Sequence, residues 1–151
     1  MGDEAARVRP TLLIVDDEEQ ILSALKRALR REGYEIVAAE TAAAALRILD
    51  ERPVDAILSD QKMPGMSGVQ LLTQAAKRRP HAVRMLITGW TEEIPIEQLE
   101  EVGVRALVTK PWDDAKLKAT LRQALGVASK ASPTQDGLDT PGRSSDYSLR
   151  R

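Results

Sequence analysis

The chemistry that this chain could perform rests on five polar residues, each at the end of a short apolar run: Asp16, Asp17, Asp60, Thr88 and Lys110. Three of them are carboxylates, which would repel each other strongly at one place unless a cation lay among them. Oxygen ligands without His or Cys favour a hard ion, Mg²⁺ first, with water completing an octahedral shell. The residue types therefore predict a magnesium site, provided that the fold brings them together.

The hydroxyl of Thr88 and the ammonium of Lys110 add a second requirement, which a metal site alone does not explain. A phosphoryl group on a carboxylate needs its negative oxygens neutralised, by a metal, an ammonium and a hydroxyl or backbone N–H. Carboxylates accept phosphoryl groups as aspartyl phosphate. Asp60 is the best candidate for the acceptor because it is the lone acid at the end of its run, whereas the adjacent Asp16 and Asp17 suit metal binding. The turn-forming residues 63–68 could direct a backbone carbonyl to the metal and backbone N–H groups to the phosphoryl group.

The apolar runs that precede these residues have the length of β-strands, and they cover residues 12–15, 36–39, 56–58, 83–87 and 106–108. Runs without polar alternation indicate strands that are buried on both faces, as in a parallel sheet. Between the runs, apolar residues recur with helical spacing within 21–29, 41–50, 67–79, 94–102 and 113–125. Thr41 and Ser67 are suitable N-caps for the second and third of these helices.

Strand and helix thus alternate five times between residues 10 and 126. Right-handed crossovers place the helices of such a chain on both faces of the sheet. The predicted fold class is α/β, a doubly wound five-stranded parallel sheet. In open sheets of this kind ligands bind outside the carboxyl ends of the strands, which is where the five polar residues are predicted to meet.

The composition is ordinary for a soluble globular protein, with 42% hydrophobic residues, 30% charged residues and a net charge of −1. It gives no reason to expect nucleic acid or a membrane as a partner. The absence of Cys excludes disulfides, and His81 is the only histidine, which disfavours His-based metal sites. Residues 1–9 are predicted to be a flexible N-terminus, neither signal peptide nor membrane anchor, and the Ser-, Pro- and Gly-containing residues 127–151 a disordered tail or linker. A cytoplasmic location is expected.

Each feature has a simpler interpretation when it is taken alone. Acids before a helix stabilise its dipole, Asp60 before a Pro-Gly loop is a common turn residue, and Lys110 resembles an ordinary surface lysine. Four such features at four strand ends of one alternating fold favour the chemical interpretation instead.

Four motifs resemble the signature of response-regulator receiver domains, the CheY-like superfamily, in that family's order and spacing. They are Leu12–Glu18, Ser59–Gly68, Ile87–Gly89 and Thr109–Trp112, and the match covers roughly Pro10 to Leu125. The resemblance implies the flavodoxin-like (βα)5 fold with strand order 2-1-3-4-5, and a receiver domain over residues 10–126.

The resemblance also implies a role for each site residue. Three aspartates and one backbone carbonyl are implied to hold Mg²⁺: Asp16, Asp17, Asp60 and Lys62. Asp60 is then the phosphorylated residue, Lys110 contacts the phosphoryl group and Thr88 reports its presence. The peptide bond before Pro111 is implied to be cis.

One position departs from the family. Leu107 stands where the family usually has an aromatic residue that works with the Thr, so a rotating Tyr or Phe is missing. We therefore expect output through the loop after Thr88 and the helix of residues 94–102, with Trp90 as a fluorescent reporter.

The function expected from this resemblance is phosphorelay signalling, in a switch rather than an enzyme. A sensor histidine kinase or a histidine phosphotransfer protein would supply the phosphoryl group, and the target would be a partner protein, an output domain or a phosphorylation-linked homodimer. A Mg²⁺-dependent phosphohydrolase is the rival, but such enzymes generally need an acid two residues after the nucleophile, where this chain has Lys62. The other rival is an interaction module that works without phosphorylation.

Overall fold

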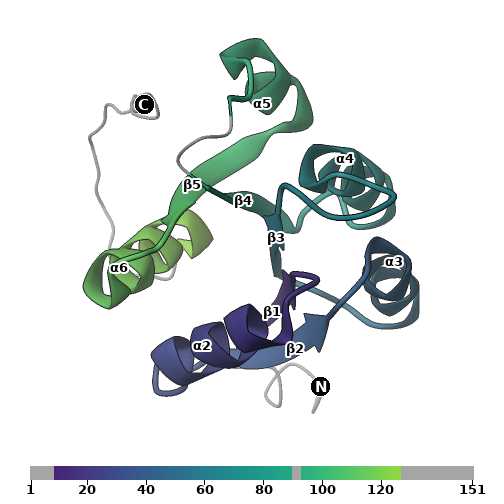
Figure 1. The fold of residues 1–151 in the computed structure, drawn as a ribbon. Coiled ribbons are helices and arrows are strands. Elements are labelled where there is room, and N and C mark those ends of the chain that lie inside the picture. The colour runs from purple at the N-terminus through teal and green to yellow at the C-terminus, as the bar shows by residue number, and fades with distance from the viewer. Residues whose placement is uncertain (1–8, 90–92, 127–151) are drawn as a thin grey trace.

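The computed structural model describes residues 9–89 and 93–126. Five strands and five helices alternate along the chain (Figure 1): β1 Thr11–Val15, α2 Glu19–Leu29, β2 Glu35–Ala39, α3 Ala42–Glu51, β3 Ala56–Asp60, α4 Gly68–Arg78, β4 Val83–Gly89, α5 Ile96–Val102, β5 Val104–Lys110 and α6 Asp114–Leu125. All neighbouring strands pair in parallel, in the order β2-β1-β3-β4-β5. The predicted fold class and strand order are confirmed.

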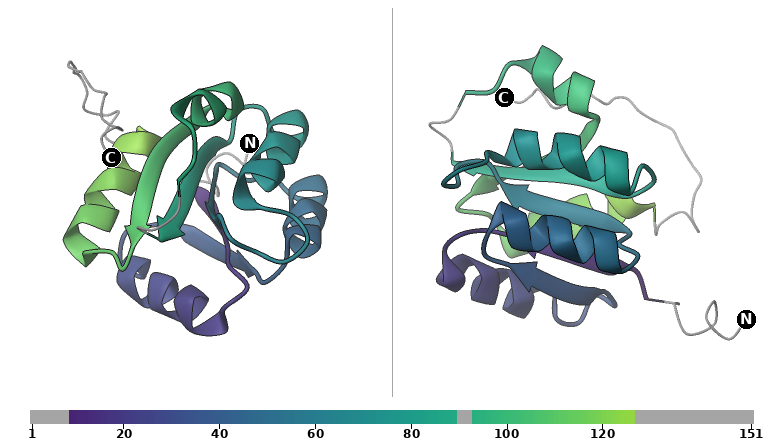
Figure 2. Two further views of the ribbon diagram at one scale, coloured as in Figure 1. Left: turned by 45° about the horizontal axis from the view of Figure 1, so that its top comes forward. Right: turned by 90° about the vertical axis from the view of Figure 1, so that its right-hand side faces the viewer.

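The helices cover both faces of the sheet, as the right-handed crossover rule requires. Helices α3, α4 and α5 pack on one face, and α2 and α6 on the other (Figures 1 and 2). β1 lies between two neighbours and beneath both helical layers, so all five of its residues are buried. This explains its unbroken apolar sequence, because neither face meets water.

Two of the predicted caps begin helices in the structure. The Thr41 side chain accepts a hydrogen bond from Ala44 N, which satisfies an otherwise unpaired donor at the start of α3. Ser67 forms a reciprocal capping box with Gln70 at the start of α4. Because each of these helices follows a strand, both begin at the edge of the sheet where the carboxyl ends of the strands lie.

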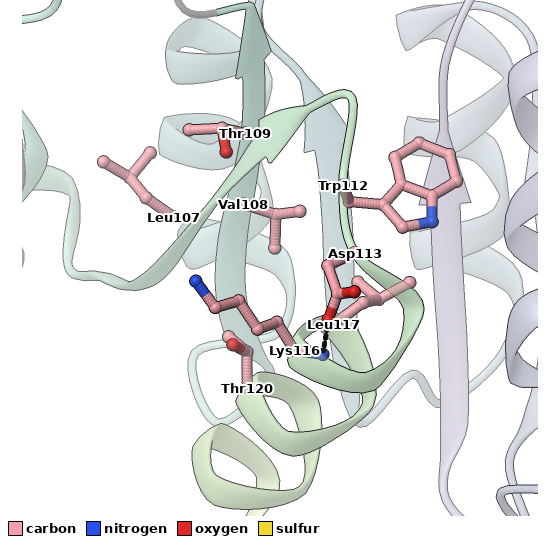
Figure 3. A pocket seen from close by; sticks show the side chains of 8 residues that line it. All are labelled: Leu107, Val108, Thr109, Trp112, Asp113, Lys116, Leu117 and Thr120. Carbon is pink, nitrogen blue, oxygen red and sulfur yellow. Dashed lines mark hydrogen bonds between the residues drawn. The ribbon is translucent and has the colours of Figure 1, made fainter.

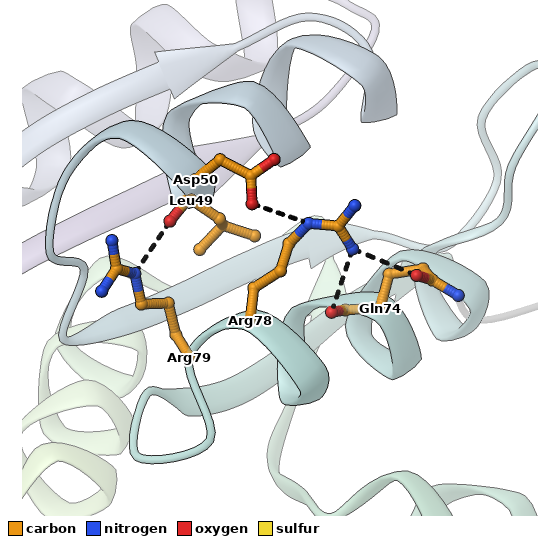
Figure 4. A network of polar contacts seen from close by, with 5 residues as sticks. All are labelled: Leu49, Asp50, Gln74, Arg78 and Arg79. Carbon is orange, nitrogen blue, oxygen red and sulfur yellow. Dashed lines mark hydrogen bonds and ion pairs between the residues drawn. The ribbon is translucent and has the colours of Figure 1, made fainter.

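Two arginines at the end of α4 join that helix to the end of α3 (Figure 4). Arg78 Nε lies 3.0 Å from Asp50 Oδ1, and Arg79 Nε donates to the carbonyl of Leu49 at 2.8 Å. The second contact satisfies a carbonyl in the last turn of α3. These two arginines thus pack one helix against the other.

The strands are longer than their apolar runs, and this changes where the polar residues stand. Asp60, Thr88 and Lys110 lie within β3, β4 and β5, not after them. Parallel pairing uses backbone groups, so the ladder continues through a polar residue wherever its neighbour is also extended.

Some expectations lie outside the described residues, namely those for Trp90, for residues 1–8 and for the tail 127–151. They stay predictions, as does the boundary of the domain at residues 10–126. No helix within the described ranges is both long enough and apolar enough to cross a membrane.

Candidate phosphoryl and metal site

Three carboxylates meet at the carboxyl edge of the sheet. Asp16 and Asp17 follow β1, and Asp60 ends the adjacent strand β3. One carboxylate oxygen from each lies within 4.8 Å of the others. Asp16 and Asp60 are buried, whereas Asp17 is exposed. The site therefore has two acids inside the protein and one at its opening to solvent.

Lys110 bridges the two buried acids from the end of β5. Its Nζ lies 3.1 Å from Asp16 Oδ2 and 3.1 Å from Asp60 Oδ1. Burial lowers the pKa of the Lys110 ammonium, but the close contact and charge of Asp16, and then those of Asp60, outweigh burial and raise the pKa above its ordinary 10.5. Lys110 is thus charged at neutral pH and offsets part of the repulsion between the two carboxylates.

The two oxygens of Asp16 differ in their surroundings. Oδ1 accepts a hydrogen bond of 2.8 Å from Glu18 N, which holds the side chain across the turn between β1 and α2. Oδ2 is enclosed and forms no hydrogen bond of standard geometry, but it forms an ion pair with the Lys110 ammonium at 3.1 Å. A buried carboxylate oxygen without an aligned donor is costly, so a metal ion bound beside it would add a second positive charge to that of the Lys110 ammonium. The oxygen donors around it fit a small divalent ion such as Mg²⁺.

The backbone of Asp60 is held on both sides. The Ser59 hydroxyl donates to the Asp60 carbonyl at 2.8 Å. The same carbonyl lies against Gly68, where a Cβ would come within 2.3 Å of it and within 2.7 Å of the Leu86 side chain. Only glycine permits so close an approach between β3 and the first residue of α4. The position of Asp60 relative to α4 therefore depends on Gly68.

Thr88 and Lys62 lie at the same edge of the sheet, at different depths. Thr88 is buried on β4, one residue beyond the partner of Asp60 in the ladder, Ile87. Lys62 lies in the loop between β3 and α4 and is exposed to solvent. The fold thus brings Asp16, Asp17, Asp60 and Lys110 together and places Thr88 and Lys62 beside them. The bond between Lys110 and Pro111 is cis, as the resemblance implied.

A hollow of about 220 Å³ lies on the outer side of β5, next to α6 (Figure 3). Its lining includes Leu107 and Thr109 from β5, and Lys116 and Thr120 from α6. The Lys116 side chain extends across the hollow toward β5. Leu107, which stands where an aromatic residue was expected, borders this hollow and is also half-buried against the core on the α3–α5 face.

Sequence reasoning gave Ser59 and Gly68 no individual roles. The signal for Gly68 was its place as the first helical residue after the Ser67 cap, where glycine weakens a helix and so requires a reason. Ser59 carried no such signal, because a hydroxyl within a strand more often bonds locally than serves a site.

Comparison with known proteins supports one family. A model described as the response regulator receiver domain matches residues 12–122. The chain is similar to the hydrogenase transcriptional regulatory protein HoxA of Bradyrhizobium diazoefficiens, with 37% identity over 91% of this chain and 28% of that protein. The HoxA protein of Cupriavidus necator is 39% identical over 83% of this chain and 25% of its own length. The chain thus spans about a quarter of the length of these curated relatives.

Solved structures agree with the sequence comparison. A CheY-like response regulator receiver domain from Methanospirillum hungatei superposes with a TM-score of 0.72 at 31% identity, over 81% of this chain and 98% of that one. The signal receiver domain of an HD domain-containing protein from Pseudomonas fluorescens gives a TM-score of 0.72 at 33% identity, over 82% of this chain and 99% of that one.

Proposed function

This chain belongs to the response regulator receiver domain family of two-component signalling. From this premise we propose that Asp60 accepts a phosphoryl group in a Mg²⁺-dependent reaction. The observation that carries the proposal is the pair of contacts from Lys110 to Asp16 and Asp60. An ammonium held between two buried carboxylates is a preorganised positive charge, and it can turn to a phosphoryl oxygen without being brought in from solvent.

The proposed reaction begins with a phosphohistidine on a kinase or phosphotransfer protein. A carboxylate oxygen of Asp60 attacks the phosphorus, so an O–P bond forms while the N–P bond to imidazole breaks. The departing imidazole nitrogen keeps the bonding electron pair and takes a proton from solvent. Mg²⁺, held by Asp16, Asp17, Asp60 and the Lys62 carbonyl, would supply positive charge to the phosphoryl oxygens.

The residues of the chain then hold the product. The Lys110 ammonium pairs with one phosphoryl oxygen in place of its contact with Asp60. The Thr88 hydroxyl, on the adjacent strand, donates to another. Hydrolysis of the acyl phosphate returns the site to its starting state, and Lys62 offers no acid at the position where phosphohydrolases use one, so this step is slow. In this proposal the protein is a switch, which catalyses only its own phosphorylation and dephosphorylation.

The partners belong to the proposal as well. The phosphoryl donor is a sensor histidine kinase or a histidine phosphotransfer protein, and the receiver domain spans residues 10–126. The curated relatives are transcriptional regulators several times the length of this chain. We infer that phosphorylation controls a partner protein, an output domain or a homodimer, through the surface of α5 and β5 that adjoins Leu107.

The acceptor is tested by phosphorylation with acetyl phosphate and MgCl2. The wild type should gain one acid-stable, base-labile phosphoryl group, detected by intact mass, and Asp60→Asn should gain none because an amide is a poor nucleophile. Asp113→Asn is the matched control, since Asp113 accepts from Lys116 N as the N-cap of α6 and asparagine caps a helix equally well. Undiminished labelling of Asp60→Asn would refute the assignment.

A further inference from the structure

The first turn of α4 has three backbone N–H groups without a helical partner, and two of them are satisfied by one residue of the loop before it. Gly68 N donates to the backbone carbonyl of Gln61, and Val69 N donates to the Gln61 side-chain oxygen, both at 2.9 Å. The third, Gln70 N, donates to the Ser67 hydroxyl at 3.2 Å. A helix start needs such acceptors, but it does not need two of them from a single residue seven and eight positions earlier in the chain.

Gln61 is also tied to the sheet. Its N–H donates to the carbonyl of Ile87 on β4 at 3.0 Å, which continues the ladder one step past Asp60. Its N–H, carbonyl and side-chain oxygen therefore all form hydrogen bonds, to two different elements. Gln61 is half-buried, so these bonds are partly shielded from water.

The position of Gln61 gives these bonds their meaning. It stands between Asp60, the proposed acceptor, and Lys62, whose carbonyl is the proposed metal ligand. We propose that Gln61 is a positioning residue for phosphoryl transfer: its carboxamide fastens the acceptor loop to the first turn of α4 and so holds the backbone on both sides of it in place. This inference rests on the proposed function of the same site.

The Gln61 side chain adds to the backbone hydrogen bonds a contact between the loop and α4. The Asp60 carbonyl already meets Gly68 and the Ser59 hydroxyl, so the strand end is held before Gln61 is reached. Beyond Gln61 the loop runs through Met63 to Gly65, whose φ of 84° marks a turn, and residues 62–65 belong to no helix or strand. The carboxamide adds a third restraint at the start of this loop, beside the two backbone hydrogen bonds of Gln61. A shift of the Lys62 carbonyl there would change the position of a metal ligand.

The chain contains a matched control at the same helix terminus. Gln70 Oε1 accepts from Ser67 N at 2.9 Å, so it makes the same kind of bond, of the same length, in the capping box. Gln70 is exposed and is not adjacent to the acceptor. Gln61→Leu and Gln70→Leu each remove one glutamine-to-backbone hydrogen bond from the start of α4, but only the first touches the loop that carries Asp60 and Lys62.

The experiment compares the full chain with Gln61→Leu, Gln61→Asn, Gln61→Glu and Gln70→Leu. Mg²⁺ affinity is measured by calorimetry with MgCl2, the rate of Asp60 labelling with acetyl phosphate at saturating Mg²⁺, and stability by urea unfolding. Gln61→Leu should bind Mg²⁺ and accept the phosphoryl group about tenfold less well, at the lower end for residues that support metal ligands. Gln61→Asn, which is one methylene too short to reach Val69 N, should show the same loss. Gln61→Glu keeps both reach and acceptor and should restore the labelling rate.

If Gln61 only stabilised the start of α4, Gln61→Leu and Gln70→Leu would change Mg²⁺ affinity and the labelling rate in the same way. We expect instead that Gln70→Leu lowers the urea midpoint, while its Mg²⁺ affinity and labelling rate stay at the wild-type values. The amide proton of Val69 should shift upfield in Gln61→Leu and stay in place in Gln61→Glu, which reports the hydrogen bond without reference to activity.

Two outcomes separate the inference from the function on which it rests. An active wild type with Gln61→Leu unchanged, or with Gln70→Leu equally impaired, would overturn the role of Gln61 and leave the acceptor assignment standing. A wild type that neither binds Mg²⁺ nor is labelled on Asp60 would overturn both.

Discussion

Replacing Lys110 by Met should destabilise this protein far more than the loss of any other described lysine, because Lys110 neutralises two buried carboxylates at once. Met keeps most of the length of the side chain and removes the ammonium group. At 3.1 Å, with an effective dielectric constant of about 20, each contact is worth roughly 5 kcal/mol of Coulomb energy. The cost of burying the three charges cancels most of this in the wild type.

The variant leaves that cost without its compensation. Asp16 has a fully buried side chain and the Asp60 side chain is 5% exposed, so neither can turn to water. Removing one partner from a buried ion pair costs about 3–5 kcal/mol, and the lower end applies because the Lys110 side chain is itself 22% exposed. A loss of about 3 kcal/mol corresponds to a melting temperature roughly 12 °C lower for a domain of this size.

Urea unfolding and differential scanning calorimetry in Mg²⁺-free buffer at pH 7 measure both quantities. Lys116→Met is the control, because Lys116 is an exposed lysine on α6 whose loss should change the free energy of unfolding by less than about 0.5 kcal/mol. Adding MgCl2 should recover part of the loss in Lys110→Met, since a bound cation takes over the neutralisation. The reasoning fails if Lys110→Met is no less stable than Lys116→Met without Mg²⁺.

Three further predictions concern the same edge of the sheet and one buried phenol. Gly68→Ala should lower the free energy of unfolding by about 3 kcal/mol, since its Cβ would meet a backbone carbonyl that cannot move. Gly33→Ala, with a φ of 91° and open space around it, should lower it by only about 1 kcal/mol, and equal losses in urea unfolding would contradict this. Asp17→Asn should raise the melting temperature of the Mg²⁺-free protein, because it removes one of three neighbouring negative charges. Mg²⁺ at ten times Kd should stabilise the wild type by about 1.4 kcal/mol and Asp17→Asn by less, and identical Mg²⁺ titrations of both proteins would count against the metal site. Burial and the Glu32 charge raise the pKa of Tyr34 above 10.0 despite the opposing Arg122 charge, so stability present below pH 10 should be lost as the pH rises through the folded-state value. Absorbance at 295 nm in Tyr147→Phe, which leaves Tyr34 as the only tyrosine, should show this late titration, and a midpoint at 10.0 would exclude it.

Much of the fold could be predicted because local and global signals agree. β1 is apolar without interruption since it is covered on both faces, and Thr41 and Ser67 begin helices because their side chains satisfy the first N–H groups. The ends of the strands could not be predicted from apolar character. Backbone ladders extend through Thr88 and Lys110 irrespective of their side chains, so the apolar run marks only the middle of each strand.

The site was predictable in its residue types and not in its contacts. The carboxylates and the lysine were found because parallel strands bring their carboxyl ends to one edge. That Lys110 lies between Asp16 and Asp60 could not be foreseen, because it depends on the lengths of two loops and on a rotamer. The same holds for Gly68, whose constraint arises only when α4 approaches β3 to within contact of the Asp60 carbonyl.

Helix α5 is held to the domain by few interactions, and this has a consequence for the native ensemble. Leu99 is its one buried residue, Ile96 is 43% exposed, and its end is secured by the left-handed Gly103 and by the hydrogen bond from Arg84 Nε to the Val102 carbonyl. The free energy of opening a segment follows the apolar surface that it buries, so we expect α5 to open locally at lower cost than β1, all of whose residues are buried. Amide exchange with deuterium would thus proceed at α5 through brief excursions that leave the acidic pocket assembled. A partner that shifts this helix on binding would therefore disturb few buried contacts.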